Sequence, residues 1–353
     1  MNAVPESQIS PAIVAALIAG VTSLVVTLLT QFFNLFSGPR IERLRSELTG
    51  QIESTRAELT DINSSRSARR DYEYDARKRL YAEIEPLLFQ LFEMAEQSYF
   101  RVINLARSAR LGALGTDETS WLRADGYYLI SSMYYMVLPA VIYRLIRNRM
   151  TFIDLDLDEQ ITAKYYLTKI YAFSLTDDFI LAQINPRLDY DPNNKDWSNL
   201  VAADPARYRR QGLVLGDMEA LLDQLIKKDE KGTRAMTFAE FESELSKEQV
   251  SEPLSELRKL FLKFNPTTKP VFARMLLIQG CLSNLILESY ELQGTAELRR
   301  SIERFVESDE FGKSFAWADE QDVSREDRDL VRDYLTVRLS WIPERGKRQG
   351  MLT

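Results

Sequence analysis

The most distinctive pattern in the chain is an uncharged stretch near its N-terminus, from Ser7 to Pro39. Within it, Ile13–Phe36 is an apolar run of 24 residues, fourteen of which are Leu, Ile, Val or Phe. As a helix this run is about 36 Å long, against a hydrocarbon core of roughly 30 Å. The pattern predicts a single transmembrane helix over residues 12–36. A cleaved signal peptide is disfavoured because no Lys or Arg precedes the run and no A-x-A site follows it, which leaves a buried core helix as the alternative.

Small and polar side chains concentrate on one side of the predicted span. They recur at steps of three and four residues and fall within an arc of about 80° on a helix. This association face consists of Ala12, Ala16, Gly20, Ser23, Thr27, Thr30 and Asn34. Small residues let helix backbones approach closely, and hydroxyls can bond across the contact. The pattern favours self-association of the spans, with a water-lined pore as a narrower hypothesis and the ordinary composition of membrane spans as the alternative.

After the span, apolar residues recur every three or four positions in a charged segment, as in a coiled coil with one four-residue stutter. The seam consists of Ile41, Leu44, Leu48, Ile52, Leu59 and Ile62, with Thr55 in the same register. It predicts a coiled-coil-like stalk over residues 40–70 and assembly of parallel copies. A single amphipathic helix packed on the rest of the protein is the alternative. The residues Asn63–Ser67 are the predicted hinge between stalk and body.

The remainder of the chain predicts an all-α, multi-helix body without an internal repeat, since Gly and Pro are scarce at 14 and 12 residues. Residues 71–185 form its first half, residues 186–204 a Pro-, Asn- and Asp-rich loop, and residues 205–341 its second half. Residues 342–353 form a basic tail. Shorter helices are expected in the second half near 205–228, 237–248, 252–264, 269–293, 295–308 and 324–340.

Three helices are predicted in the first half of the body, and one of them is apolar enough to raise the question of a second span. A long helix with a buried apolar face is expected from Tyr72 until Gly112–Thr116 closes it, and another over about 159–183. The stretch Tyr127–Tyr143 is uncharged for 17 residues. Its five tyrosines and two serines need hydrogen-bond partners, which favours a buried core helix, with a second membrane span as the alternative.

Charge sets the expected orientation. Arg40, Arg43, Arg45 and Arg56 follow the span, while no Lys or Arg precedes it. The positive-inside tendency then leaves residues 1–11 on the extracytoplasmic side of the membrane and the body in the cytoplasm, so that the protein is predicted to be a single-pass component of the inner membrane. The single cysteine, Cys281, agrees, because no intrachain disulfide can form.

Composition excludes several kinds of chemistry. The chain has no histidine, which removes Ser–His–Asp and Cys–His catalysis, mixed Cys/His zinc sites and the Arg-x4-His motif of HEPN-type ribonucleases. A net charge of −7 disfavours general nucleic-acid binding. No catalytic constellation is visible, so no enzymatic activity and no cofactor are expected.

Three segments resemble phosphate-binding or calcium-binding loops, but each lacks residues that the motif requires. Gly312-Lys313-Ser314 lacks the preceding glycine and strand of a phosphate-binding loop. Two acidic clusters lack the turn glycine and the final bidentate acid of a calcium loop, so helix capping and turns explain them and no metal site is expected. These clusters are Asp154, Asp156 and Asp158, and Asp189, Asp191 and Asn193.

Two basic clusters are candidate sites for an anionic ligand. One ends an apolar helix and the other opens the second half of the body, and arginine forks bind phosphate in a bidentate manner. Their members are Arg144, Arg147 and Arg149, and Arg207, Arg209 and Arg210. The alternative for each cluster is a solvated helix end, and the tail residues Arg345, Lys347 and Arg348 are expected to be free or to touch anionic lipid.

In layout alone the chain is similar in outline to single-span bacterial effector proteins of immunity systems. The expected function is a membrane-anchored, self-associating helical effector or scaffold, whose partners are membrane lipid, further copies of the chain, and a cytoplasmic partner protein or small ligand. A pore-forming or membrane-perturbing effector is the sharper form of this hypothesis. A passive tether that holds a soluble partner at the membrane is the alternative.

Overall fold

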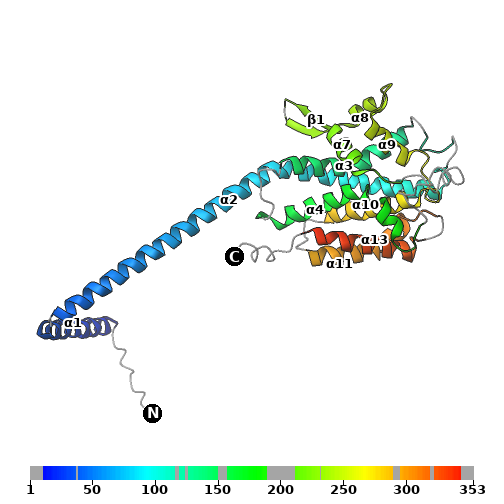
Figure 1. Ribbon diagram of the computed structural model, residues 1–353. Helices are drawn as coiled ribbons and strands as arrows, with labels where there is room; N and C mark the ends of the chain where they lie inside the picture. Colours follow the sequence, from blue (N-terminus) through cyan, green and yellow to red (C-terminus); the bar gives the residue numbers. More distant parts are fainter. Residues whose placement is uncertain are drawn as a thin grey trace, which may run out of the picture. The chain divides into compact units, whose positions relative to one another are not determined.

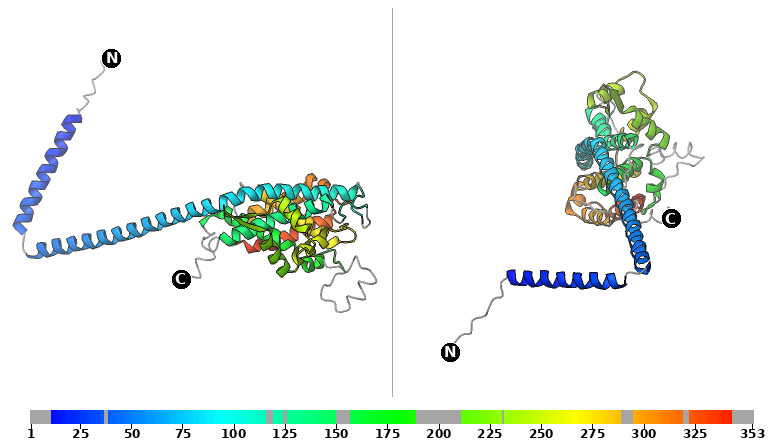
Figure 2. Two further views of the ribbon diagram at one scale, coloured as in Figure 1. Left: turned by 90° about the horizontal axis from the view of Figure 1, so that it is seen from above. Right: turned by 90° about the vertical axis from the view of Figure 1, so that its left-hand side faces the viewer.

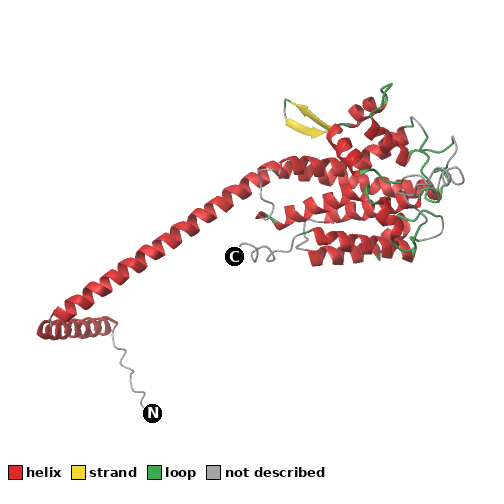
Figure 3. Ribbon diagram, in the orientation of Figure 1, coloured by secondary structure: helices red, strands yellow, loops and turns green. Residues whose placement is uncertain are grey.

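The computed structural model describes residues 11–36, 39–115, 119–123, 126–149, 157–188, 211–230, 232–288, 295–318 and 322–342. The described chain is mostly helical, as expected (Figure 3). It divides into two compact units, Met1–Glu73 and Tyr74–Thr353.

The first unit contains α1, Pro11–Phe36, and the beginning of α2, which extends over Pro39–Arg110. The predicted hinge at Asn63–Ser67 is wrong, because these residues are helical within α2. Each Ser or Asn lowers helix stability only by tenths of a kcal/mol, and strong helix formers surround them. The Ser64 hydroxyl donates to the Asp61 carbonyl at 2.9 Å, a local bond that a helix accommodates. The helix also continues through Pro86.

The second unit contains the rest of α2 and the remaining elements. In chain order these are α3 Tyr127–Arg149, α4 Glu159–Ser174, α5 Asp178–Gln183, α7 Leu215–Gln224, β1 Ile226–Asp229, β2 Gly232–Ala235, α8 Phe238–Leu245, α9 Glu252–Phe261, α10 Pro270–Glu288, α11 Thr295–Val306, α12 Asp309–Ser314, α13 Arg325–Arg338 and the 3₁₀ turn η3 Leu339–Trp341. Gly112, with φ +67°, follows the end of α2 as expected, since glycine adopts this left-handed conformation without strain.

The long helices of the second unit lie side by side around one apolar core (Figures 1 and 2). The helix α10 contacts α4, α5, α11 and α13, while α3 contacts α4 and the α7–α9 region. The ring of Tyr99 on α2 lies against Phe305 and Phe315, so α2 also joins this core. One continuous core therefore unites both predicted halves of the body.

A two-stranded hairpin corrects the prediction of helix over residues 205–228. The chain leaves α7 at Gln224, and β1 pairs antiparallel with β2, with Ile226 opposite Ala235. Gly232 at the turn has φ +126°, which only glycine adopts readily. The Met236 amide donates to the Leu225 carbonyl at 2.8 Å and closes the hairpin. Because the strands have four residues each, their short pattern was indistinguishable from a helix end.

Two smaller corrections concern helix boundaries. The helix expected over 159–183 is divided into α4 and α5 by residues 175–177. The short helix α12 was not predicted; Ser308 caps it by accepting from the Phe311 amide at 3.1 Å. Residues 189–204 of the predicted loop and the predicted tail from 343 lie outside the described residues.

Three helices are long and apolar enough to cross a membrane, but they differ in burial. Residues Val14–Phe32 of α1 are entirely exposed, whereas 83% of the most apolar window is buried in both α3 and α10. The side chains of α3 and α10 therefore build the core of the second unit. This is the buried placement that the tyrosines and serines of Tyr127–Tyr143 predicted.

Candidate interaction surfaces

None of the described residues Val14–Phe32 of α1 is buried within the protein. Large apolar side chains along it are roughly half exposed, from 44% for Val14 to 66% for Phe32. Exposure of so many Leu, Val and Phe side chains to water is unfavourable by about 25 cal/mol per Å². The surface therefore requires an apolar environment, which a bilayer or a partner helix supplies.

Six of the seven residues of the predicted association face are described on α1 and are exposed: Ala12, Ala16, Gly20, Ser23, Thr27 and Thr30. The side chain of Asn34 lies outside the described residues. A shallow apolar recess surrounds Gly20 and is lined by Ala16, Leu17, Val21, Leu24 and Val25. A Cβ atom added to Gly20 would meet nothing within 4 Å. A larger residue there would fit the single chain and would interfere only with a neighbouring molecule.

The two threonine hydroxyls of the association face already have partners within their own helix. Thr27 donates to the Ser23 carbonyl at 2.7 Å and Thr30 to the Val26 carbonyl at 2.5 Å. Thr22, outside the face, donates to the Ile18 carbonyl at 2.6 Å. These hydroxyl protons therefore need no second helix, because a bond to the carbonyl four residues earlier satisfies them. Close backbone approach at Ala16 and Gly20 remains the stronger reason for association.

The predicted seam forms a second exposed apolar stripe, on the first part of α2. Five of its residues are exposed by 40–63%: Leu44, Leu48, Ile52, Leu59 and Ile62. The side chain of Ile41 lies outside the described residues. Charged residues surround the stripe, and the opposite side carries small polar residues such as Ser46. The stripe is covered by no other described element of the chain.

The first basic cluster is engaged in ion pairs. Arg144 binds both Asp223, at 2.8 Å, and Glu219, while Arg147 donates to Glu219 at 3.0 Å. Arg149 donates to Glu83 at 2.6 Å. These contacts join the end of α3 to α7 and α2, which is a structural use of the cluster. The role of Arg144, Arg147 and Arg149 in binding an anion stays a prediction, and Arg207, Arg209 and Arg210 lie outside the described residues.

An acidic residue of the first half and the last helix form a buried polar network. Asp177 accepts hydrogen bonds from the Tyr334 hydroxyl and the Arg338 guanidinium. The side chains of Arg338 and Asp177 are only 15% and 9% exposed. The Arg338 guanidinium also lies 4.5 Å from the centroid of the Trp341 ring. The sequence gives no sign of this network beyond the four-residue spacing of Tyr334 and Arg338, since Asp177 is 161 residues away from Arg338.

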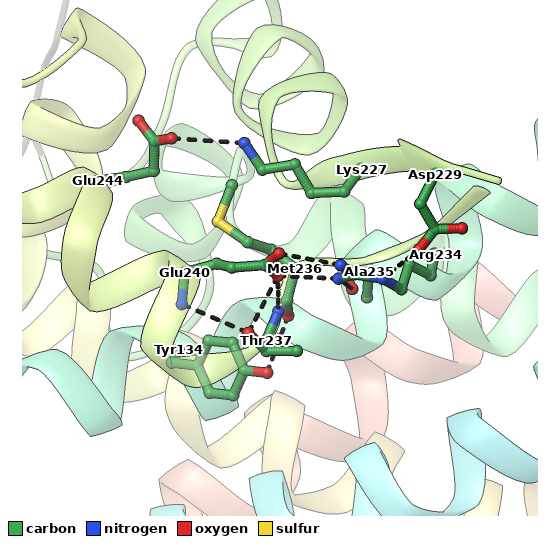
Figure 4. A network of polar contacts seen from close by, with 9 residues as sticks. All are labelled: Tyr134, Lys227, Asp229, Arg234, Ala235, Met236, Thr237, Glu240 and Glu244. Carbon is green, nitrogen blue, oxygen red and sulfur yellow. Dashed lines mark hydrogen bonds and ion pairs between the residues drawn. The ribbon is translucent and has the colours of Figure 1, made fainter. Parts of the chain in front are cut away.

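The hairpin carries a second network, which joins it to α8 (Figure 4). The Arg234 guanidinium donates to both carboxylate oxygens of Glu240, at 2.8 and 2.9 Å, and to Asp229 at 2.9 Å. Glu240 also accepts from the Thr237 amide in a capping box. These bonds hold the pKa of Glu240 far below its ordinary value of 4.5, with the Arg234 hydrogen bonds as the largest cause.

Two acidic residues of the hairpin region, Asp229 and Glu240, lie close enough together for the Arg234 guanidinium to bind both. Asp229 at the end of β1 and Glu240 in the first turn of α8 are the first and last of twelve consecutive residues, which is the spacing of the outermost ligands in an EF-hand loop. Here the chain between them is a hairpin, and a guanidinium lies where the two carboxylates converge. The arrangement is therefore a self-contained ion pair that braces the hairpin, and sequence inspection for calcium loops did not detect it.

Other reactive groups are engaged in the core or in helix caps. Cys281 is buried, and burial raises the pKa of its thiol. Asp158 caps α4 by accepting from the Gln160 and Ile161 amides, both at 2.9 Å, as the capping interpretation predicted; Asp154, Asp156 and the second acidic cluster lie outside the described residues. No group of three or more metal-ligating side chains occurs in the described ranges.

Known proteins add nothing to this picture. No family model matches the chain, and neither the curated proteins nor the solved structures contain a similar protein. Function must therefore be argued from the exposed surfaces and polar networks themselves.

Proposed function

We propose that this protein is a membrane-anchored, self-associating helical scaffold or effector, whose second unit binds a cytoplasmic partner or small ligand. The observation that carries the proposal is the complete exposure of Val14–Phe32, an apolar helix with none of its residues buried. In this proposal α1 crosses the inner membrane once, with the N-terminus outside. The arginines that follow the span support this orientation.

Extraction of native membranes tests the anchor. The chain should remain with the membranes at alkaline pH in carbonate and should become soluble only with detergent. Leu24→Arg places a charge in the middle of α1, where it costs about 2.5–3.5 kcal/mol, and should shift the chain toward the soluble or aggregated fraction. A chain that is freely soluble without detergent would refute the anchor.

Self-association is proposed to use the seam of α2, with a second copy of the same chain as the partner. Two spans inserted in the same direction impose a parallel arrangement, so that each seam residue meets its own counterpart. Interaxial distances of roughly 8–10 Å and a Cα radius of about 2.3 Å bring facing Cα atoms to roughly 3.4–5.4 Å. A disulfide spans Cα distances of about 4.4–6.8 Å, whereas outward-facing Cα atoms would be about 13–15 Å apart.

Cysteine cross-linking in native membranes tests the seam. Leu48→Cys should give disulfide-linked dimers under mild oxidation, and Ser46→Cys, on the opposite side of the helix, should not. The natural Cys281 gives little background because it is buried. Equal cross-linking of the two variants, or none, would contradict the parallel seam. Ser46→Cys also reports orientation, since an impermeant maleimide should label it only after the cells are permeabilised.

The effector and tether versions differ in what the span must do. A passive tether should tolerate replacement of α1 by any unrelated span. An effector whose spans act together should lose activity in Gly20→Leu but keep it in Ala19→Leu, which adds the same side chain outside the association face. A membrane-potential dye in expressing cells measures the pore form of this activity. Absence of depolarisation under every stimulus, together with tolerance of a swapped span, would leave the tether.

A further inference from the structure

Lys169 on α4 lies in an unusual environment within the second unit. Its ammonium is 5.0 Å from the centroid of the Trp341 ring, 5.6 Å from that of Tyr166 and 5.9 Å from that of Phe173. Phe173 and Trp341 meet edge to face, with centroids 5.6 Å apart. Lys169 and the three rings are half-buried. We refer to these four residues as the Lys169 cluster.

The neighbouring cations are neutralised, but Lys169 is not. Arg144 is bound to Glu219 and Asp223, and Arg338 to Asp177. Among the residues that the structure describes, no carboxylate lies within 4.0 Å of the Lys169 ammonium, which lies over the rings of Tyr166, Phe173 and Trp341. Burial lowers the pKa of Lys169 below its ordinary value of 10.5, and the positive charge of Arg147 lowers it further.

Arg147 and the Lys169 cluster belong to one packed surface. Tyr143 on α3 contacts Tyr165, at a centroid distance of 5.6 Å, and Phe173, at 6.5 Å. Tyr165 and Phe173 are the residues one turn before and one turn after Lys169 on α4, and Arg147 is one turn after Tyr143 on α3. Arg147 is 47% exposed and donates to Glu219 among the described residues, which leaves further guanidinium donors open to solvent.

We propose that Lys169 and Arg147 form a binding site for a phosphate group, either on a soluble phosphate ester or on a phospholipid headgroup. An anion between the two side chains removes their mutual repulsion and supplies the charge partner that Lys169 lacks. The rings of the cluster hold the lysine stem in place, so little side-chain freedom is lost on binding. The site does not depend on membrane insertion or on the seam, and it adds a ligand class to the proposed function.

Calorimetric titration of the full chain in neutral phosphatidylcholine nanodiscs tests the soluble source, with inorganic pyrophosphate as the probe. Nanodiscs containing phosphatidylinositol 4-phosphate test the lipid source, with pyrophosphate competition as the readout. Lys169→Met keeps the apolar stem and should weaken binding at least tenfold, as should Arg147→Gln. Lys228→Met removes an exposed lysine of the hairpin and should change affinity less than twofold.

A second measurement separates lost binding from lost folding. Lys169→Arg keeps the charge and should restore binding to within a few-fold of the original chain. Acylation of Lys169, followed by mass spectrometry on the unmodified sequence, should be slowed by pyrophosphate, while acylation of Lys228 should not. Saturable binding in either arm that is lost in Lys169→Met supports the site. Absence of saturable binding in both arms, or equal affinity of Lys169→Met and Lys228→Met, overturns it.

Discussion

Truncation of Leu48 tests the proposal that the seam of α2 holds two copies together. Complete burial of a leucine side chain contributes about 1.5–3 kcal/mol. Leu48 is 53% exposed in the single chain, so roughly half of this energy is still available to a partner helix. For the two Leu48 side chains of a parallel dimer the sum is about 1.6–3.2 kcal/mol. Because about 1.4 kcal/mol is a factor of ten, Leu48→Ala should weaken dimerisation by roughly 15- to 200-fold.

Energy transfer between donor- and acceptor-labelled copies provides the assay. Full-length chains in lipid vesicles are diluted with added lipid, and the dissociation constant is read as a mole fraction. Ser46→Ala is the matched control, because it alters an exposed position on the opposite side of the same helix turn and should leave the constant within about twofold. If Leu48→Ala and Ser46→Ala dilute identically, α2 does not join copies through this stripe, and any association must come from α1.

Three further predictions concern the second unit. Asp177→Ala leaves the Arg338 guanidinium buried without its carboxylate and should lower the free energy of unfolding, measured by denaturant titration, by about 3–5 kcal/mol. Tyr334→Phe should lower it by only about 1–2 kcal/mol. A loss below about 1 kcal/mol for Asp177→Ala would contradict the network. Because the Arg234 hydrogen bonds lower the pKa of Glu240, the contribution of this pair to stability is present above the ordinary pKa of 4.5 and is lost as the pH falls through the lowered pKa. In an acid titration followed by NMR, the Glu240 carboxylate should stay ionised well below pH 4.5, and a Glu240 carboxyl that titrates at its ordinary pKa of 4.5 would argue against the bond. Arg274, only 4% exposed, donates to the backbone carbonyls of Leu181, Ile184 and Pro186 at the end of α5 and just after it. Arg274→Met should therefore destabilise the chain by roughly 3 kcal/mol, and a melting temperature equal to that of the original would refute this.

The local sequence pattern was sufficient to predict a structural element wherever the interactions that form the element lie within a few helical turns of the chain. The apolar run of α1, the helical periodicity of α10 and the cap at Asp158 can all be identified without knowledge of neighbouring elements. Side-chain spacing on a helix fixes which residues share a face, and capping depends on three or four consecutive residues. Most of the predicted helices are therefore present among the described residues. The exceptions are the division of residues 159–183 into α4 and α5, the hairpin that begins at Ile226, and the unpredicted α12.

The failures have a common cause in competing local preferences. Asn63–Ser67 contains turn-favouring residues, yet their combined cost is small and the surrounding helix of α2 overrides it. Ile226–Asp229 was expected at a helix end, but the turn at Gly232 and its closing hydrogen bond to Leu225 produce a hairpin. Short segments have nearly equal energies in either conformation, so their contacts with the rest of the protein decide between them.

The sequence by itself determined that the chain is mostly helical and contains an uncharged helix long enough to span a bilayer. The polar side chains of Tyr127–Tyr143 already favoured burial of α3, and the tertiary structure shows that α3 and α10 are buried in the core and that α1 is not. It likewise brought Asp177 to Arg338 and left Lys169 among rings without a carboxylate. Helical periodicity is encoded in neighbouring residues and can be read from the sequence. Burial and charge pairing depend instead on segments more than a hundred residues apart, which meet only after the helices have packed.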